Sequence, residues 1–217
     1  TMALAELATA RLEGDFEAAL TAADALLAEA AEHVDGPEDG TREALVRAML
    51  GETALWAHDL IRAGEELRRA VALARAHRLD HLAVAALSSL ALHDVMVFGP
   101  ADEQEHGQQA IDLAARRGWS RIPQCACAHT ALALHAFYDL APERAARHLE
   151  HAQDAAAGLR RPHLDFVLAH LQARMCGADG RPRDGLRVLE DFIAVQRHRG
   201  AALRLEPVSL AATRAHL

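Results

Sequence analysis

The sequence LALHAFYDLAPERAARHL, residues 132–149, contains the features that decide the fold. An apolar stretch holds a leucine followed by a small residue, Leu132-Ala133, and a second stretch with a small residue at Ala145 follows Pro142. Proline is well tolerated at the first position of a helix, because the N–H that it lacks would have no partner there. The segment therefore predicts the end of one helix, a short turn and the start of another.

These features recur along the chain at intervals of about 40 residues, which indicates an array of repeated units. The recurring small residues are Gly51, Ala91, Ala133 and Ala173, and the recurring prolines are Pro100, Pro142 and Pro182. Second helices carry small residues one heptad apart, as in Ala63 and Ala70 or Ala145 and Ala152. Helices cross closely only where side chains are small. This pattern is similar to that of tetratricopeptide repeats, so we predict an all-α, right-handed superhelix of about five tetratricopeptide-like helical hairpins with a concave surface.

The turn signals divide the chain into hairpins. The predicted hairpins span residues 3–33, 42–78, 82–117, 122–159 and 163–199, followed by a partial helix at 207–217. Thr41, Asp80 and Ser120 are predicted to cap helices. We expect a single repeat domain over residues 1–217, cut from a longer polypeptide, because the last predicted helix lacks a partner and Thr1 precedes a methionine.

Composition narrows the classes of partner. The hydrophobic content of 51% supports a sizeable core, whereas only 4% of residues are aromatic, so the core must be built from closely packed alanine and leucine. The formal net charge of -8 opposes direct contact with nucleic acid. The chain has three cysteines, no signal segment at its start and no apolar run of the roughly 20 residues that span a bilayer. We expect a cytoplasmic protein that does not contact a membrane.

Cysteine and histidine near residue 127 raise the question of a metal site, since both suit zinc. Cys125 and His129 share a helix face, but Cys127 points elsewhere, and Cys-x-Cys lacks the spacing of common zinc knuckles. We therefore predict buried cysteines and no metal. No catalytic grouping can be nominated from the sequence, so we expect neither an enzyme nor a cofactor.

The tetratricopeptide register places Trp56, Met96 and Tyr138 at the end of the first helix of successive hairpins, where that helix lines the inner groove. Neighbours in the same register are Glu52, Ser88, Thr130, His170 and Arg174. An aromatic face with a few polar groups suits a sugar or another polar small molecule, and it equally suits a partner helix or peptide. The alternative for each residue is that it completes the core between repeats.

Several short segments of the sequence resemble a known family in more than the repeat pattern. AARRGWS at residues 114–120, and LALH at 132–135 followed by ERAARHL at 143–149, resemble the superhelical sensor region of large LuxR-type, MalT-like transcriptional regulators, a family common in actinobacteria. The resemblance covers nearly the whole chain. It implies a segment between an ATPase module and a helix-turn-helix module, which in the maltose regulator binds the inducing sugar.

The resemblance implies a regulatory sensor or interaction segment that binds a small-molecule inducer or a protein partner in its concave groove. The adjacent ATPase and helix-turn-helix modules of the parent chain would be further partners, and the segment could self-associate. Neither module is expected within this chain, which has no lysine for a nucleotide-binding loop and no basic face. The alternative is a constitutive tetratricopeptide scaffold for protein–protein interaction, without a small-molecule ligand.

Overall fold

The computed structural model describes residues 2–32, 37–98, 105–119, 121–158 and 161–198. In these ranges the chain forms α-helices and one 3-10 turn, and no strand. The elements are α1 (Met2–Glu13), α2 (Phe16–Glu32), α3 (Pro37–Trp56), α4 (Leu60–Ala76), α5 (Asp80–Phe98), α6 (Glu105–Arg116), η1 (Pro123–Cys125), α7 (Ala126–Tyr138), α8 (Pro142–Ala156), α9 (Pro162–Ala178) and α10 (Pro182–His198).

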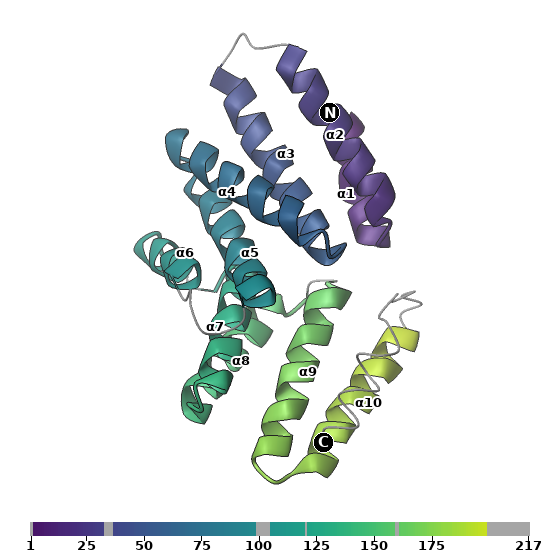
Figure 1. The fold of residues 1–217 in the computed structure, drawn as a ribbon, viewed down its shortest axis with the longest axis vertical. Helices are drawn as coiled ribbons and strands as arrows, with labels where there is room; N and C mark the ends of the chain where they lie inside the picture. The colour runs from purple at the N-terminus through teal and green to yellow at the C-terminus, as the bar shows by residue number, and fades with distance from the viewer. Residues whose placement is uncertain (1, 33–36, 99–104, 120, 159–160, 199–217) are drawn as a thin grey trace.

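Consecutive helices pair as α1/α2, α3/α4, α5/α6, α7/α8 and α9/α10, and each pair packs on the next. Figure 1 shows the pairs following a curved path, with α6 on one side and both α1 and α10 on the other. The predicted all-α fold of stacked helical hairpins is confirmed.

Prolines begin helices throughout the described part of the chain. They are Pro37, Pro123, Pro142, Pro162 and Pro182. Each fits the first position because that N–H has no helical partner. Pro100 and Pro207 lie outside the described residues, as does the predicted helix at 207–217.

Two predicted caps are wrong. Thr41 lies inside α3, because that helix already begins at Pro37. Asp80 is the first residue of α5 rather than its cap, and its carboxylate forms an ion pair with Arg117. The third predicted cap, Ser120, lies outside the described residues. The helix predicted from Ile122 begins at Ala126, because Pro123 opens a 3-10 turn before it.

The small residues permit the close helix contacts that the sequence predicts. Gly51 of α3 faces Leu67 of α4 so closely that an added Cβ would lie 2.7 Å from the Leu67 Cγ atom and 3.0 Å from its backbone nitrogen. Ala91, Ala133 and Ala173, at the same position of the later hairpins, are buried. The heptad pairs Ala63 and Ala70, and Ala145 and Ala152, are also buried.

Among the described residues, helix α5 is long and apolar enough to cross a membrane. This finding corrects the expectation that the chain has no apolar run of that length. However, 67% of the apolar segment Asp80–Val97 is buried inside the fold. That burial is typical of the core helix of a soluble protein.

A buried polar network interrupts the apolar surface of α5. Asp94 accepts hydrogen bonds from His93 at 2.9 Å and from His106 of α6 at 2.7 Å, while the second ring nitrogen of His93 lies 2.9 Å from the carbonyl oxygen of Leu60. Both ring nitrogens of His93 therefore lie within hydrogen-bond distance of an oxygen acceptor. Burial alone would raise the pKa of Asp94, but hydrogen bonds from His106 and His93 hold it below its usual value. The network ties α4, α5 and α6 together.

We predict that Gly51→Ala lowers the free energy of unfolding by about 1–3 kcal/mol, because the new methyl group meets backbone that cannot move aside. This loss is the net effect: the cost of the steric clash exceeds the roughly 1 kcal/mol that alanine gains over glycine in helix propensity. Thermal melts followed by circular dichroism measure the change.

The matched variant is Gly107→Ala, whose Cβ would meet side-chain atoms alone, the nearest being the Cγ atom of Leu132 at 3.2 Å. We expect a smaller loss there, because that side chain can shift. A Gly51→Ala protein as stable as the wild type would contradict the close packing of α3 on α4.

Candidate functional site

The eight residues predicted to line the groove do not form one surface in the structure. Ser88 and Thr130 do not line it, because they are only 1% and 0% exposed. The Ser88 hydroxyl accepts a hydrogen bond from the backbone N–H of Ala128 at 2.7 Å, and the Thr130 hydroxyl donates to the carbonyl of Ala126 at 2.8 Å. The groove prediction is wrong for both, since each hydroxyl lies on a buried face of its helix. Met96 is partly buried against the hydrophobic core.

Glu52 of α3 lies at the centre of an ionic contact between distant hairpins. Its carboxylate accepts a hydrogen bond from Arg11 of α1 and another from the indole N–H of Trp56. Nη1 of Arg161, just before α9, lies 3.6 Å from Oε1 of Glu52. Burial alone would raise the pKa of Glu52, but the charges of Arg11 and Arg161 outweigh it and hold the pKa below its usual value. Glu52 is therefore ionised.

An aromatic contact adjoins this ion pair. The ring of His163 in α9 stacks on Trp56, with centroids 5.8 Å apart and an interplanar angle of 25°. The other neighbour of His163 is Phe16 of α2, whose centroid is 5.0 Å away. Burial, with a smaller effect from His58, lowers the pKa of His163, so its ring is neutral at pH 7.

We call Arg11, Phe16, Glu52, Trp56, Arg161 and His163 the inner cluster. Its residues come from the first, second and fifth hairpins and the segment leading into the fifth. Non-adjacent hairpins of a curved array can meet only on its concave side. The predicted groove is therefore filled by side chains at this level. Arg161 also donates a hydrogen bond to the sulfur of Cys127. Burial of Cys127, with the nearby charge of Glu52, raises the pKa of its thiol to about 12.

A second group of predicted residues meets between α7 and α9. Nη1 of Arg174 donates a hydrogen bond to the Tyr138 hydroxyl at 2.6 Å, and its guanidinium lies 5.0 Å from the ring centroid of Phe137 and 5.1 Å from that of Tyr138. His170, one turn before Arg174, has a pKa lowered by burial and by the Arg174 charge. We call Phe137, Tyr138, His170 and Arg174 the Tyr138 surface. Tyr138 itself is 46% exposed.

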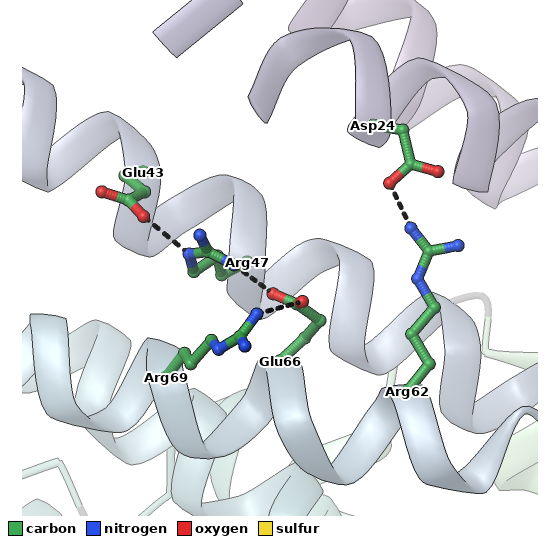
Figure 2. Close-up of polar contacts among 6 residues, drawn as sticks. All are labelled: Asp24, Glu43, Arg47, Arg62, Glu66 and Arg69. Atoms are coloured by element: carbon green, nitrogen blue, oxygen red, sulfur yellow. Dashed lines mark hydrogen bonds and ion pairs between the residues drawn. The ribbon is translucent and has the colours of Figure 1, made fainter. Parts of the chain in front are cut away.

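An ionic network in the second hairpin, which Figure 2 shows, was not predicted from the sequence. Arg47 of α3 donates to Glu43 at 2.7 Å and to Glu66 of α4 at 2.6 Å, and Arg69 donates to the other Glu66 oxygen at 3.2 Å. Nearby, Arg62 of α4 pairs with Asp24 of α2. The arginines and carboxylates were visible in the sequence, but pairing across helices needs their register, so we assign these contacts to the packing of the first two hairpins.

Three histidines also converge between α7 and α8. Nδ1 of His129 lies 3.2 Å from Nδ1 of His148, and the His129 and His151 ring centroids are 5.1 Å apart. Burial, then the neighbouring histidines, lowers the pKa of His129 to about 4. Within the described ranges, no three histidine, cysteine, aspartate or glutamate side chains are placed to hold a metal ion. The three cysteines are free and buried.

A cavity of about 310 Å³ lies between α4, α5 and α6. Three of its polar lining residues already have partners, because Arg75 donates to Gln109 at 2.7 Å and Asp80 pairs with Arg117. Arginines and aspartates both line it, so their charges offset each other. None of the predicted groove residues lines this cavity, and the inner cluster and the Tyr138 surface are the better candidate sites.

Comparison with known proteins supports the fold. No protein-family model matches the chain, and no curated protein matches it. Among solved structures, the chain is similar to the crystal structure of BtubC (BKLC) from P. vanneervenii, with a TM-score of 0.59 and 14% identity over 93% of this chain and 80% of that chain. At this identity the likeness shows the helical fold alone.

We predict that stability falls as the pH drops from about 6.5 to about 4, in part because of His129. In this interval His129 binds a proton in the unfolded chain but not in the folded chain. The free energy of unfolding therefore falls by up to about 3 kcal/mol by pH 4. Urea denaturation across this pH range should show a shallower slope for His129→Gln. Replacement of the exposed His198 by glutamine is the control and should leave the slope unchanged. Equal slopes for His129→Gln and the wild type would contradict the assignment.

Proposed function

We propose that this chain is a cytoplasmic regulatory binding module, the sensor or interaction segment of a LuxR-type, MalT-like transcriptional regulator. The observation that supports binding is the Tyr138 surface, where three residues selected from the sequence, Tyr138, His170 and Arg174, come together from two hairpins. The proposal of the regulator family rests on the resemblance of the sequence. Catalysis has no part in this proposal.

The Tyr138 surface has the chemistry of a recognition site. Tyrosine and arginine are the residue types that most often dominate binding energy at protein interfaces. Arg174 is already oriented by the Tyr138 hydroxyl and two aromatic rings. A side chain that is held in place before binding loses less conformational entropy when a partner arrives. A carboxylate or a hydroxyl-rich ligand would find donors on Arg174 and an aromatic ring beside them.

Regulation requires that a bound ligand prefer one of two states of the module. Helix α9 offers such a connection, because Arg174 lies in its last third while His163 at its start belongs to the inner cluster. A ligand on the Tyr138 surface therefore contacts the same rigid helix whose other end joins the first two hairpins. Binding that moves α9 would change the balance between an inactive regulator and one competent for self-association.

A constitutive protein-interaction scaffold is the second candidate, and one observation favours it. Side chains of the inner cluster occupy the concave side near the start of α9, while Tyr138 is 46% exposed at the end of α7. An exposed, shallow aromatic surface suits a partner helix or peptide better than it suits an enclosed small molecule.

We predict that Arg174→Met or Tyr138→Ala weakens binding of the natural ligand or partner about tenfold or more while circular dichroism remains that of the wild type. A thermal-shift screen against sugars, nucleotides and small metabolites finds a ligand, since one at ~100 times its dissociation constant stabilises the fold by about 2.7 kcal/mol. The exposed Arg187 is the control position, and Arg187→Met should bind as the wild type does. Binding that both Tyr138-surface variants retain in full would contradict the site.

The parent reading frame tests the family. A nucleotide-binding loop upstream and a helix-turn-helix downstream would support the regulator. A bare repeat array, together with no response to any small molecule and with binding of a protein partner, would support the scaffold instead.

A further inference from the structure

The inner cluster carries an excess of positive charge. Arg11 and Arg161 are the charged groups that act on Glu52, and both are positive. His163 is neutral at pH 7 because burial lowers its pKa. One carboxylate therefore faces two guanidinium groups, and the cluster has a net charge of about +1 at a site partly removed from water.

Arg161 has more N–H donors than its contacts with Glu52 and Cys127 use. Its Nη1 atom is 3.6 Å from Oε1 of Glu52, which is an ion pair but longer than a hydrogen bond. A guanidinium carries five N–H donors in a planar fork that matches a carboxylate. Its side chain is 31% exposed, so a ligand can reach it from solvent. Glu52, in contrast, is bound closely by Arg11 and by the indole of Trp56.

Flat aromatic surface lies directly beside these charges. The ring of His163 stacks on Trp56 and also contacts the ring of Phe16. The cluster thus holds a carboxylate of its own, that of Glu52, on two arginines next to aromatic rings. The same chemistry fits a free carboxylate attached to an aromatic ring.

The inner cluster joins the start of α9 to the first two hairpins, and a ligand that displaces its side chains can break this contact. Helices α3 and α4, or α7 and α8, pack along their lengths, whereas α9 reaches the first two hairpins through side chains at its start. The packing of α9 on α7 and α8 is also less extensive than the packing inside each hairpin. Loss of the cluster would therefore free the start of α9 from the first two hairpins, while Leu164, Leu168 and Leu171 keep the fifth hairpin packed on the fourth.

We propose that the inner cluster is a binding site for a small aromatic carboxylate, which takes the place of Glu52 on Arg161, packs its ring against Trp56 and His163, and releases the fifth hairpin from the first two. The site is separate from the Tyr138 surface and does not depend on what binds there. Glu52 acts as an internal competitor that keeps the site closed while no ligand is present.

Phenylacetate is the probe, and benzyl alcohol is its uncharged counterpart. Trp119→Phe leaves Trp56 as the one tryptophan of the chain, so its fluorescence reports binding at the cluster. We expect saturable quenching by phenylacetate and none by benzyl alcohol over the same range. Glu52→Gln removes the competing charge and should tighten phenylacetate binding about tenfold, whereas Arg161→Met should abolish it. Arg161→Lys keeps the charge without the planar fork and should weaken it.

Glu66 provides a matched control, because it is also a carboxylate between two arginines, Arg47 and Arg69, as Figure 2 shows. Its neighbours in that network are not aromatic, so Glu66→Gln should leave phenylacetate binding at the wild-type level. Circular dichroism first establishes that each variant is folded; if Arg161→Met is not, Arg161→Lys decides.

The proposal is overturned if neither the wild type nor Glu52→Gln responds to phenylacetate, if Glu52→Gln and Glu66→Gln tighten binding equally, or if the folded Arg161 variants bind as the wild type does. These outcomes leave the Tyr138 surface untouched, whose own variants test it separately.

Discussion

The close approach of paired helices at small residues is the constraint on which the rest of the structure depends. Gly51 leaves no room for a methyl group beside Leu67, and Ala91, Ala133 and Ala173 occupy the same position in later hairpins. Helices that cross at such short range bury their alanine-rich faces with few large side chains. The repeated spacing makes the array curve regularly, and the curvature brings the first, second and fifth hairpins within reach of one another's side chains (Figure 1).

The charged residues at this contact between the first, second and fifth hairpins determine its properties. A buried carboxylate is tolerated only when hydrogen bonds and opposite charges replace its water. Glu52 has both, from Arg11 and Trp56 on one side and Arg161 on the other. The contact therefore stabilises a closed array and at the same time remains open to competition by another carboxylate. Helix α9 extends from this cluster to Arg174, so the two candidate sites share one rigid element.

The sequence predicted the local features well because they depend on local chemistry. Pro142 and Pro182 begin helices because the first position of a helix needs no N–H donor, and Ala145 and Ala152 are buried because their spacing puts them on one helix face. Thr41 failed as a cap because Pro37 upstream already begins the helix. Ser88 and Thr130 failed as groove residues because each lies on a buried face of its helix. Glu52 and Trp56 were selected, but their partners Arg161 and His163 could not be, since that pairing follows from the curvature of the whole array.

The distance between the first and last hairpins tests most directly whether the inner cluster closes the array. Spin labels at Glu6→Cys on α1 and Arg187→Cys on α10 occupy exposed positions, whereas the native cysteines are buried. Pulsed electron paramagnetic resonance should give one narrow distance distribution for the otherwise native chain. The distribution should widen towards longer distances when Glu52→Gln and His163→Ala are combined, but not with Glu66→Gln. A distribution that is already broad before these changes, or one that the combined variant leaves unaltered, would contradict closure by the cluster.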